Sequence, residues 1–271
     1  MAATRCIYAL SRRPDNTTRL VCFPHAGAGA SIYCAWDRLV PHDVGVHAVQ
    51  LAGREQRADE QLRIDWVPLV EEICDALARW HDQPFAFYGH SLGGLIAYEV
   101  ANALRRRGAT GPRMLFVGAS YAPSAVRKAG THFEDDESLL QIVRRFGGVD
   151  DTFAAEPEFV RHFLPVIAAD FTLFNRYVYD AARDRLDCPV IALYGTHDAD
   201  HDGASMARWK LHTRGSFHAH AVHGGHFFHR ESAREAIEHI VSHLGSRSQL
   251  RTSEVVDEFY GTVRSEVGTG K

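Results

Sequence analysis

One short stretch of this 271-residue chain could supply a nucleophile, the pentapeptide GHSLG at 89–93. It follows the apolar, strand-like residues 85–88 and opens a helix-like stretch that ends near Gly108. A tight turn between a strand and a helix exposes the serine Oγ at the start of the helix, and glycines on both sides let the two elements pack closely. The five residues alone are a weak signal, because a glycine-rich connection has the same spelling. Their position between a strand and a helix favours Ser91 as a nucleophile.

A histidine and a carboxylate that could activate Ser91 follow later in the chain. A serine hydroxyl is a poor nucleophile until a base takes its proton, and a carboxylate orients that base. His226 comes after a strand-like run and a Gly-Gly turn that could direct its ring toward the serine. Three aspartates come shortly after the strand-like run at 190–195: Asp198, Asp200 and Asp202. The order serine, aspartate, histidine is the order found in α/β-hydrolases.

The same two segments are rich in histidine, which makes a metal site the alternative. The further histidines are His197, His201, His218, His220 and His223. His218 and His220 would share one face of a strand, because side chains on a strand alternate between its faces. None of the pairs matches a known metal signature such as His-Glu-x-x-His. We therefore expect no metal, and we expect these five histidines to be surface residues.

Strand-like runs alternate with helix-like ones through most of the chain. The strand-like runs are 19–23, 46–51, 85–89, 114–119, 190–195 and 218–222. Between and after them, apolar residues recur with the spacing of one helical face: Val70, Ile73, Cys74, Leu77 and Ile237, Ile240, Val241, Leu244. Short strands separated by helices predict βαβ units, and hence an α/β fold with a mostly parallel sheet that has helices on both faces.

The alternation stops over residues 121–186, where the apolar spacing is helical throughout. We expect a helical insertion here, interrupted at Pro165, because proline disrupts a helix interior. Such an insertion can form a lid that excludes water from a site, with Phe171 and Phe174 as candidate lining residues; the alternative is a peripheral helical hairpin. The predicted core is then 1–120 with 187–245, and 246–271 forms a tail that is weakly amphipathic and then disordered.

Composition narrows the classes of partner and location. The formal net charge is −4 and basic residues are not concentrated, so nucleic acid is not expected as a partner. The N-terminus lacks the apolar core of a signal peptide, and no apolar run is long enough to span a bilayer. The five cysteines are an odd number without paired spacing, which favours reduced thiols over a disulfide framework. These features predict a soluble cytoplasmic protein.

Six motifs in one order resemble a known family, the type II thioesterases that accompany nonribosomal peptide and polyketide synthases. The motifs are CFPHAGAGAS (22–31), VQLAGRE (49–55), PFAFYGHSLGG (84–94), LPVIAADFTLFNRYVY (164–179), LDCPVIALYG (186–195) and VHGGHFF (222–228). The resemblance runs from about Leu20 to Leu244. It departs from the family at Ala52, where proline is usual, and at Leu92 and Gly94, where methionine and alanine are common. After Asp198 the family commonly has proline and a valine-containing turn, and this chain has ADHD.

The resemblance implies an α/β-hydrolase fold and a Ser91, His226, Asp198 triad. Alignment on Gly195 makes Asp198 the triad acid, and Asp200 or Asp202 would then be helix caps. The alternative assignment is that Asp200 or Asp202 takes the place of Asp198 in the triad. An oxyanion hole would form from the backbone N–H groups of Leu92, after the nucleophile, and Ala26.

The family's substrates are acyl groups held as thioesters on the phosphopantetheine arm of a carrier protein. The resemblance therefore implies carrier-protein partners, hydrolysis without a cofactor of the enzyme's own, and a monomer. Most of the family edits, clearing aberrant acyl groups from stalled carriers. Release of a finished product, general esterase or acyl-CoA hydrolase activity, and a non-catalytic binding module are the alternatives.

Overall fold

A computed structural model describes residues 6–11, 17–78, 80, 83–128, 131–147, 156–181 and 185–245. The predicted tail over 246–271 lies outside these residues. Within them, no helix has both the length and the apolar character needed to cross a membrane. All five cysteines are free thiols, as predicted.

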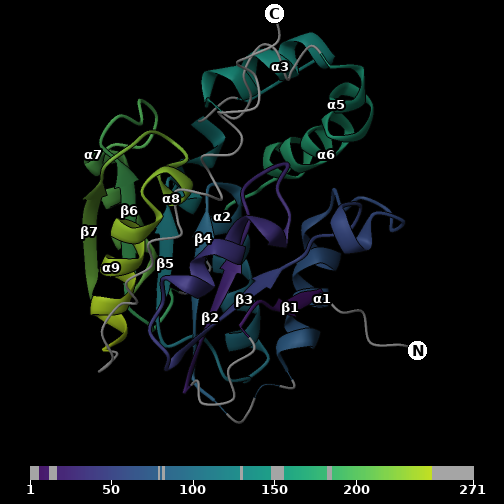
Figure 1. Ribbon diagram of the computed structural model, residues 1–271. Helices are drawn as coiled ribbons and strands as arrows, with labels where there is room; N and C mark the ends of the chain where they lie inside the picture. Colours follow the sequence, from purple (N-terminus) through teal and green to yellow (C-terminus); the bar gives the residue numbers. More distant parts are fainter. Residues whose placement is uncertain are drawn as a thin grey trace, which may run out of the picture.

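Seven strands form one sheet with the order β1-β3-β2-β4-β5-β6-β7 (Figure 1). The strands are β1 (Ile7–Ala9), β2 (Thr18–Phe23), β3 (Val44–Val49), β4 (Phe85–His90), β5 (Leu115–Gly118), β6 (Val190–Gly195) and β7 (Phe217–Val222). Every neighbouring pair is parallel except β1 and β3, which are antiparallel. The six predicted strands are all present, and the short edge strand β1 is an addition that the sequence analysis missed.

Helices cover both faces of the sheet, which confirms the predicted α/β-hydrolase architecture. The helices α1 (Trp66–Leu77) and α2 (Leu92–Arg106) pack into one apolar core. The 3-10 helix η1 (Ala30–Arg38) and the helix α9 (Ala233–Leu244) pack into a second core on the opposite face. The short elements are η2 (Glu55–Arg57), η3 (Pro123–Lys128), α7 (Gly203–Met206), η4 (Ala207–His212) and α8 (Phe228–Glu231). Helix α9 ends at Gly245, whose φ of +68° is a left-handed conformation that glycine adopts without strain.

Three helices lie between β5 and β6, in the segment predicted to be a helical insertion. They are α3 (Asp136–Arg145), α5 (Pro157–His162) and α6 (Leu164–Asn175). Asp135 begins α3 with a reciprocal capping box, in which Ser138 N–H donates to its carboxylate. Pro165 lies in the first turn of α6, where its missing N–H costs nothing, so the helices break there as predicted. Figure 1 shows the three helices grouped beyond the carboxyl ends of the parallel strands.

Candidate active site

The turn between β4 and α2 holds Ser91 in a strained backbone conformation. Its φ is +53° and its ψ is −120°, a region that residues with a side chain rarely occupy. A Cβ on Gly89 would collide with the backbone of Gly93 and Gly94, and a Cβ on Gly93 would collide with the carbonyl oxygen of Phe23 in β2. The glycines are therefore required by close packing of strand against helix, which is the geometry that exposes a serine at a helix N-terminus.

The ring of His226 is oriented by the carboxylate of Asp198. Its Nδ1 donates to Asp198 Oδ2 over 2.9 Å, and both side chains are buried. Because Nδ1 is bonded to Asp198, Nε2 is the ring nitrogen that is available to accept a proton from Ser91. Ser91 and His226 line the same cavity. This is the arrangement in which a carboxylate holds an imidazole in the tautomer that can accept a proton from a serine.

The other two aspartates have different partners. Asp202 is the N-cap of α7 and accepts the N–H of Ser205 over 2.7 Å. Asp200 forms an ion pair with Arg145 at the end of α3, and so it is not the cap considered as its alternative role. The structure thus places Asp198, and neither of its neighbours, against His226.

A buried histidine at the end of β4, His90, holds the backbone at His226. His90 Nε2 donates to the carbonyl oxygen of His226 over 2.7 Å, and Tyr88 donates its hydroxyl to His90 Nδ1 over 2.9 Å. Two further rings, those of His25 and His229, surround His90. Burial lowers the pKa of His25 to about 3, and it also holds the pKa values of His90 and His229 well below their usual range. This part of the site is therefore uncharged at neutral pH.

His201 is a component of the site that the sequence analysis placed wrongly at the surface. Only 2% of it is exposed, and its Nδ1 donates to Asp198 Oδ2 over 3.2 Å. The carboxylate also accepts the backbone N–H groups of Asp200 and His201. Asp198 thus accepts hydrogen bonds from two imidazoles. One of them, His201, belongs to the turn that contains valine in the type II thioesterases. The HDADHD stretch places His201 close to Asp198 in sequence, but local spacing does not determine whether its ring points inward or to solvent.

Burial and the two histidines shift the pKa of Asp198 in opposite directions. Burial raises the pKa of this carboxyl, but the hydrogen bonds from His201 and His226 outweigh it and hold the pKa well below its usual value. For His226, burial lowers the pKa, the bond to Asp198 opposes this, and repulsion from His201 lowers it further. His226 is therefore neutral at pH 7 and can act as a base.

We expect His201→Val to move the acid limb of the kcat/KM profile upward by roughly half a pH unit. Removing His201 removes its repulsion and leaves Asp198 to His226 alone, so the pKa of His226 rises. Because only neutral His226 can accept a proton, activity at acidic pH falls about threefold and activity near pH 8 changes little. The measurement is initial rate of thioester hydrolysis against pH, with His197→Val, at an exposed position, as the control. An unmoved acid limb would show that His201 only fills space.

Asp198, His201 and His226 are also the residues here that could contact a metal ion. Each offers one ligand atom, and these atoms lie within 4.8 Å of one another. The same atoms are already joined by the hydrogen bonds described above. Metal-free chemistry at this site stays a prediction.

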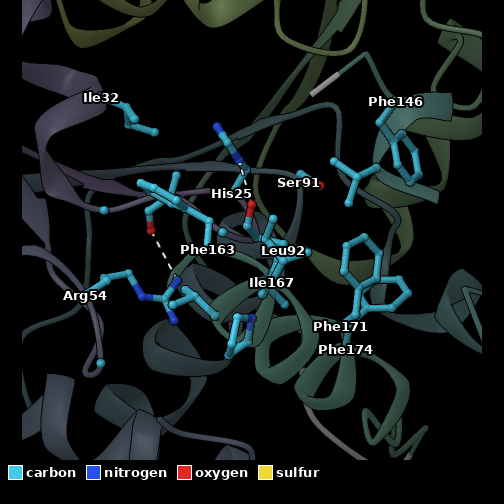
Figure 2. A pocket seen from close by; sticks show the side chains of 18 of the residues that line it. His25, Ile32, Arg54, Ser91, Leu92, Phe146, Phe163, Ile167, Phe171 and Phe174 are labelled. Atoms are coloured by element: carbon cyan, nitrogen blue, oxygen red, sulfur yellow. Dashed lines mark hydrogen bonds between the residues drawn. The ribbon is translucent and has the colours of Figure 1, made fainter. Parts of the chain in front are cut away.

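Ser91 opens onto a cavity of about 810 Å³ between the sheet and the helices α3, α5 and α6. Both predicted lining residues, Phe171 and Phe174, lie on its wall. Figure 2 shows them together with Phe146 on one side of the pocket. The ring of Phe146 also lies 4.8 Å from that of His226, so the end of α3 covers the histidine. The cavity can therefore hold an apolar group next to Ser91.

The two predicted oxyanion donors border the same cavity. Leu92 is the first residue of α2, so its N–H has no acceptor within the helix. Ala26 lies in the loop after β2 and lines the cavity with Leu92. The next N–H in that loop, that of Gly27, is already bonded to Asp170 Oδ2 over 2.7 Å. Gly27 has a φ of +82°, and a Cβ there would lie 2.7 Å from Ile167 of α6.

A buried ion pair joins α6 to the core of the molecule, and the sequence analysis did not foresee it. Both terminal nitrogens of Arg54 bind the carboxylate of Asp170, over 2.5 Å and 2.8 Å. Arg54 also donates to the carbonyl oxygen of Ala28 over 3.2 Å (Figure 2). The carboxylate of Asp170 therefore supports Arg54 and the loop that carries Ala26 at the same time.

Comparison with known proteins places this geometry in a family. The family described as "Thioesterase domain" matches residues 18–247. The chain is 34% identical to "Thioesterase PikA5" of Streptomyces venezuelae, over 85% of this chain and 82% of that protein. The solved structure of the RedJ thioesterase from the prodiginine pathway of Streptomyces coelicolor is 36% identical with a TM-score of 0.75, over 85% of this chain and 86% of that one. YbtT, a type II thioesterase from the yersiniabactin NRPS/PKS pathway, is 25% identical with a TM-score of 0.77, over 88% and 97%.

This chain therefore belongs to the thioesterase-domain family of α/β-hydrolases. The matches confirm the resemblance to the type II thioesterases of polyketide and nonribosomal peptide pathways.

Proposed function

We propose that this protein is a serine thioesterase that removes acyl groups from the phosphopantetheine arm of carrier proteins in polyketide or nonribosomal peptide biosynthesis. The observation that carries the proposal is the position of Ser91, in a strained turn that opens on the cavity that His226 also lines, with Asp198 bonded to His226. Family membership supplies the thioester as the bond to be broken.

In the first half of the reaction, His226 Nε2 takes the proton of Ser91 and the serine oxygen attacks the thioester carbonyl carbon. Asp198 stabilises the imidazolium that forms. The negative charge on the carbonyl oxygen is held by the N–H groups of Leu92 and Ala26. The carbon–sulfur bond then breaks, His226 gives its proton to the leaving thiolate, and the acyl group remains on Ser91 as an ester.

In the second half, His226 takes a proton from a water molecule, and the hydroxide attacks the ester carbonyl. The proton returns to the oxygen of Ser91 as the carbon–oxygen bond breaks. The products are the free carboxylic acid and the regenerated serine. The helices over the cavity limit the access of water, so that hydrolysis follows acyl transfer. We propose residues 121–186 as this lid.

Editing is the role we propose for this activity. The cavity volume of about 810 Å³ is toward the upper end of the range of sites for small molecules, roughly 300–1,000 Å³, so it has room for an acyl chain. Phe171 and Phe174 make one part of its wall apolar, and charged side chains such as Arg161 and Glu60 lie elsewhere on its lining. The editing role is supported by the resemblance to the type II thioesterases, most of which clear aberrant acyl groups from stalled carriers.

The test is hydrolysis of a panel of acyl groups of graded length, each presented on a carrier protein, on coenzyme A and as a simple ester. We expect the highest kcat/KM for short acyl groups on the carrier. Equal turnover of the coenzyme A thioesters and simple esters would identify a general hydrolase. Activity confined to full-length chains would identify product release.

A further inference from the structure

A second group of histidines lies away from the cavity, where the last strand meets the last helix. Helix α9 runs alongside β7, which has no neighbour on its other side in the described sheet (Figure 1). Two of the histidines are on the strand and two on the helix: His218, His220, His239 and His243. The function proposed above uses none of them.

The sequence spacing brings each pair to one face of its element. His218 and His220 are two residues apart on a strand, so both side chains point to the same side of the sheet. His239 and His243 are four residues apart on a helix, so they lie one above the other. Packing of α9 against β7 then brings the two pairs together.

One pair of rings, one from the strand and one from the helix, is close enough to share a ligand, and the other two rings lie beside it. His220 Nε2 lies 2.8 Å from His243 Nε2. The ring of His220 stacks on that of His239 with centroids 4.5 Å apart, and the ring of His218 lies 5.0 Å from that of His243. All four side chains are partly or fully exposed, so an ion can enter from solvent and the rings can rotate.

We propose that His220 and His243 form a two-histidine site for a divalent transition-metal ion of the zinc type, with water completing the coordination. Imidazole nitrogens are preferred ligands of such ions. Zinc bonds of about 2.0–2.1 Å in a tetrahedral site place two nitrogens roughly 3.4 Å apart, so a small rotation of either ring makes room for the ion.

The position of the site gives it a structural consequence. The chain between His220 and His243 contains the loop of His226 and the helix α8. A metal ion that binds both ends of this segment in the folded chain, and not the unfolded chain, stabilises the folded state. We therefore expect metal binding to raise stability without entering the reaction at Ser91.

The experiment is calorimetric titration of the untagged full chain with zinc chloride, together with thermal unfolding with and without zinc. We expect the wild-type protein to bind zinc and to melt several degrees higher when saturated. His220→Ala with His243→Ala should weaken binding at least about tenfold, or about 1.4 kcal/mol, and remove the thermal shift. The control is His197→Ala with His223→Ala, because these two exposed rings also lie close together, with centroids 5.3 Å apart.

The active-site cluster is the competing location, and His201→Val separates it from the proposed site. Under the proposal, His201→Val binds zinc as the wild type does, and zinc-saturated wild-type protein keeps its reaction with a fluorophosphonate probe. Zinc binding that survives loss of His220 and His243 but disappears in His201→Val would overturn the proposal. Equal weakening by the control pair would overturn it as well.

Discussion

Ser91→Ala is expected to lower kcat/KM for thioester hydrolysis by about 10⁴-fold or more, because it removes the atom that forms the acyl-enzyme. The fold should persist. Alanine has the same Cβ as serine, so the backbone at φ +53° is no more strained in the variant than in the wild type. The change in the free energy of unfolding should remain within about 1 kcal/mol.

The measurement is release of free thiol from an acylated carrier protein, with mass spectrometry of the enzyme to detect the covalent acyl adduct. Ser31→Ala is the matched control. Ser31 also lines the cavity, but its hydroxyl donates to Glu55 and it lies far in sequence from the turn between β4 and α2. It should keep most of the activity. Turnover retained in Ser91→Ala, or an adduct on another residue, would contradict the proposed mechanism.

Asp170→Ala is expected to destabilise the protein by about 3–5 kcal/mol, because it leaves the buried guanidinium of Arg54 without its partner. Only 7% of Arg54 and 1% of Asp170 are exposed, so water cannot replace the lost contacts easily. The same change releases the N–H of Gly27 and loosens the loop that carries Ala26. We therefore also expect kcat to fall by about tenfold to a hundredfold, since the oxyanion donor at Ala26 loses its position.

Asp65→Ala is the control that separates the effect of burying an ion pair from the effect of losing one. Asp65 forms an ion pair of 2.8 Å with Arg176, just beyond the end of α6, and both side chains are at least half exposed. Exposed pairs contribute about 0–1 kcal/mol, so this variant should unfold almost as the wild type does. Urea unfolding and kcat should be measured on both variants. If they lose the same stability, the Arg54–Asp170 pair does not hold the lid.

A paired variant, Arg54→Met with Asp170→Leu, distinguishes stability from catalysis. It removes both charges together, so it should recover much of the stability lost in Asp170→Ala. Gly27 N–H still lacks its acceptor, and kcat should therefore remain low. Recovery of both quantities would show that the loop needs no carboxylate.

The parts of the fold that could be predicted are those determined by the local spacing of apolar residues, glycine and proline. The six strands and the faces of α1 and α9 follow from the spacing of apolar residues, because burial selects that spacing directly. The turn at Ser91 was predictable because only glycine fits at positions 89 and 93. The break at Pro165 follows from the chemistry of one residue.

The contacts that could not be predicted join residues whose partners are set by the tertiary fold. Arg54 and Asp170 are 116 positions apart, and nothing near either residue identifies the other. His201 is close to Asp198 in sequence, but its ring could point to solvent or inward with equal ease until the surrounding turn is built. Strand β1 has only three residues and is defined by pairing with β3, so it carries too little pattern of its own.

The Asp170 carboxylate links the position of a helix to the anion-binding groups. It belongs to α6, and it holds both Arg54 and the N–H of Gly27. If α6 moved away from the sheet, these bonds would break and the loop that carries Ala26 would lose its support, whereas the N–H of Leu92 belongs to α2 and would stay in place. One of the two proposed oxyanion donors therefore depends on α6 lying against the sheet, and the other does not.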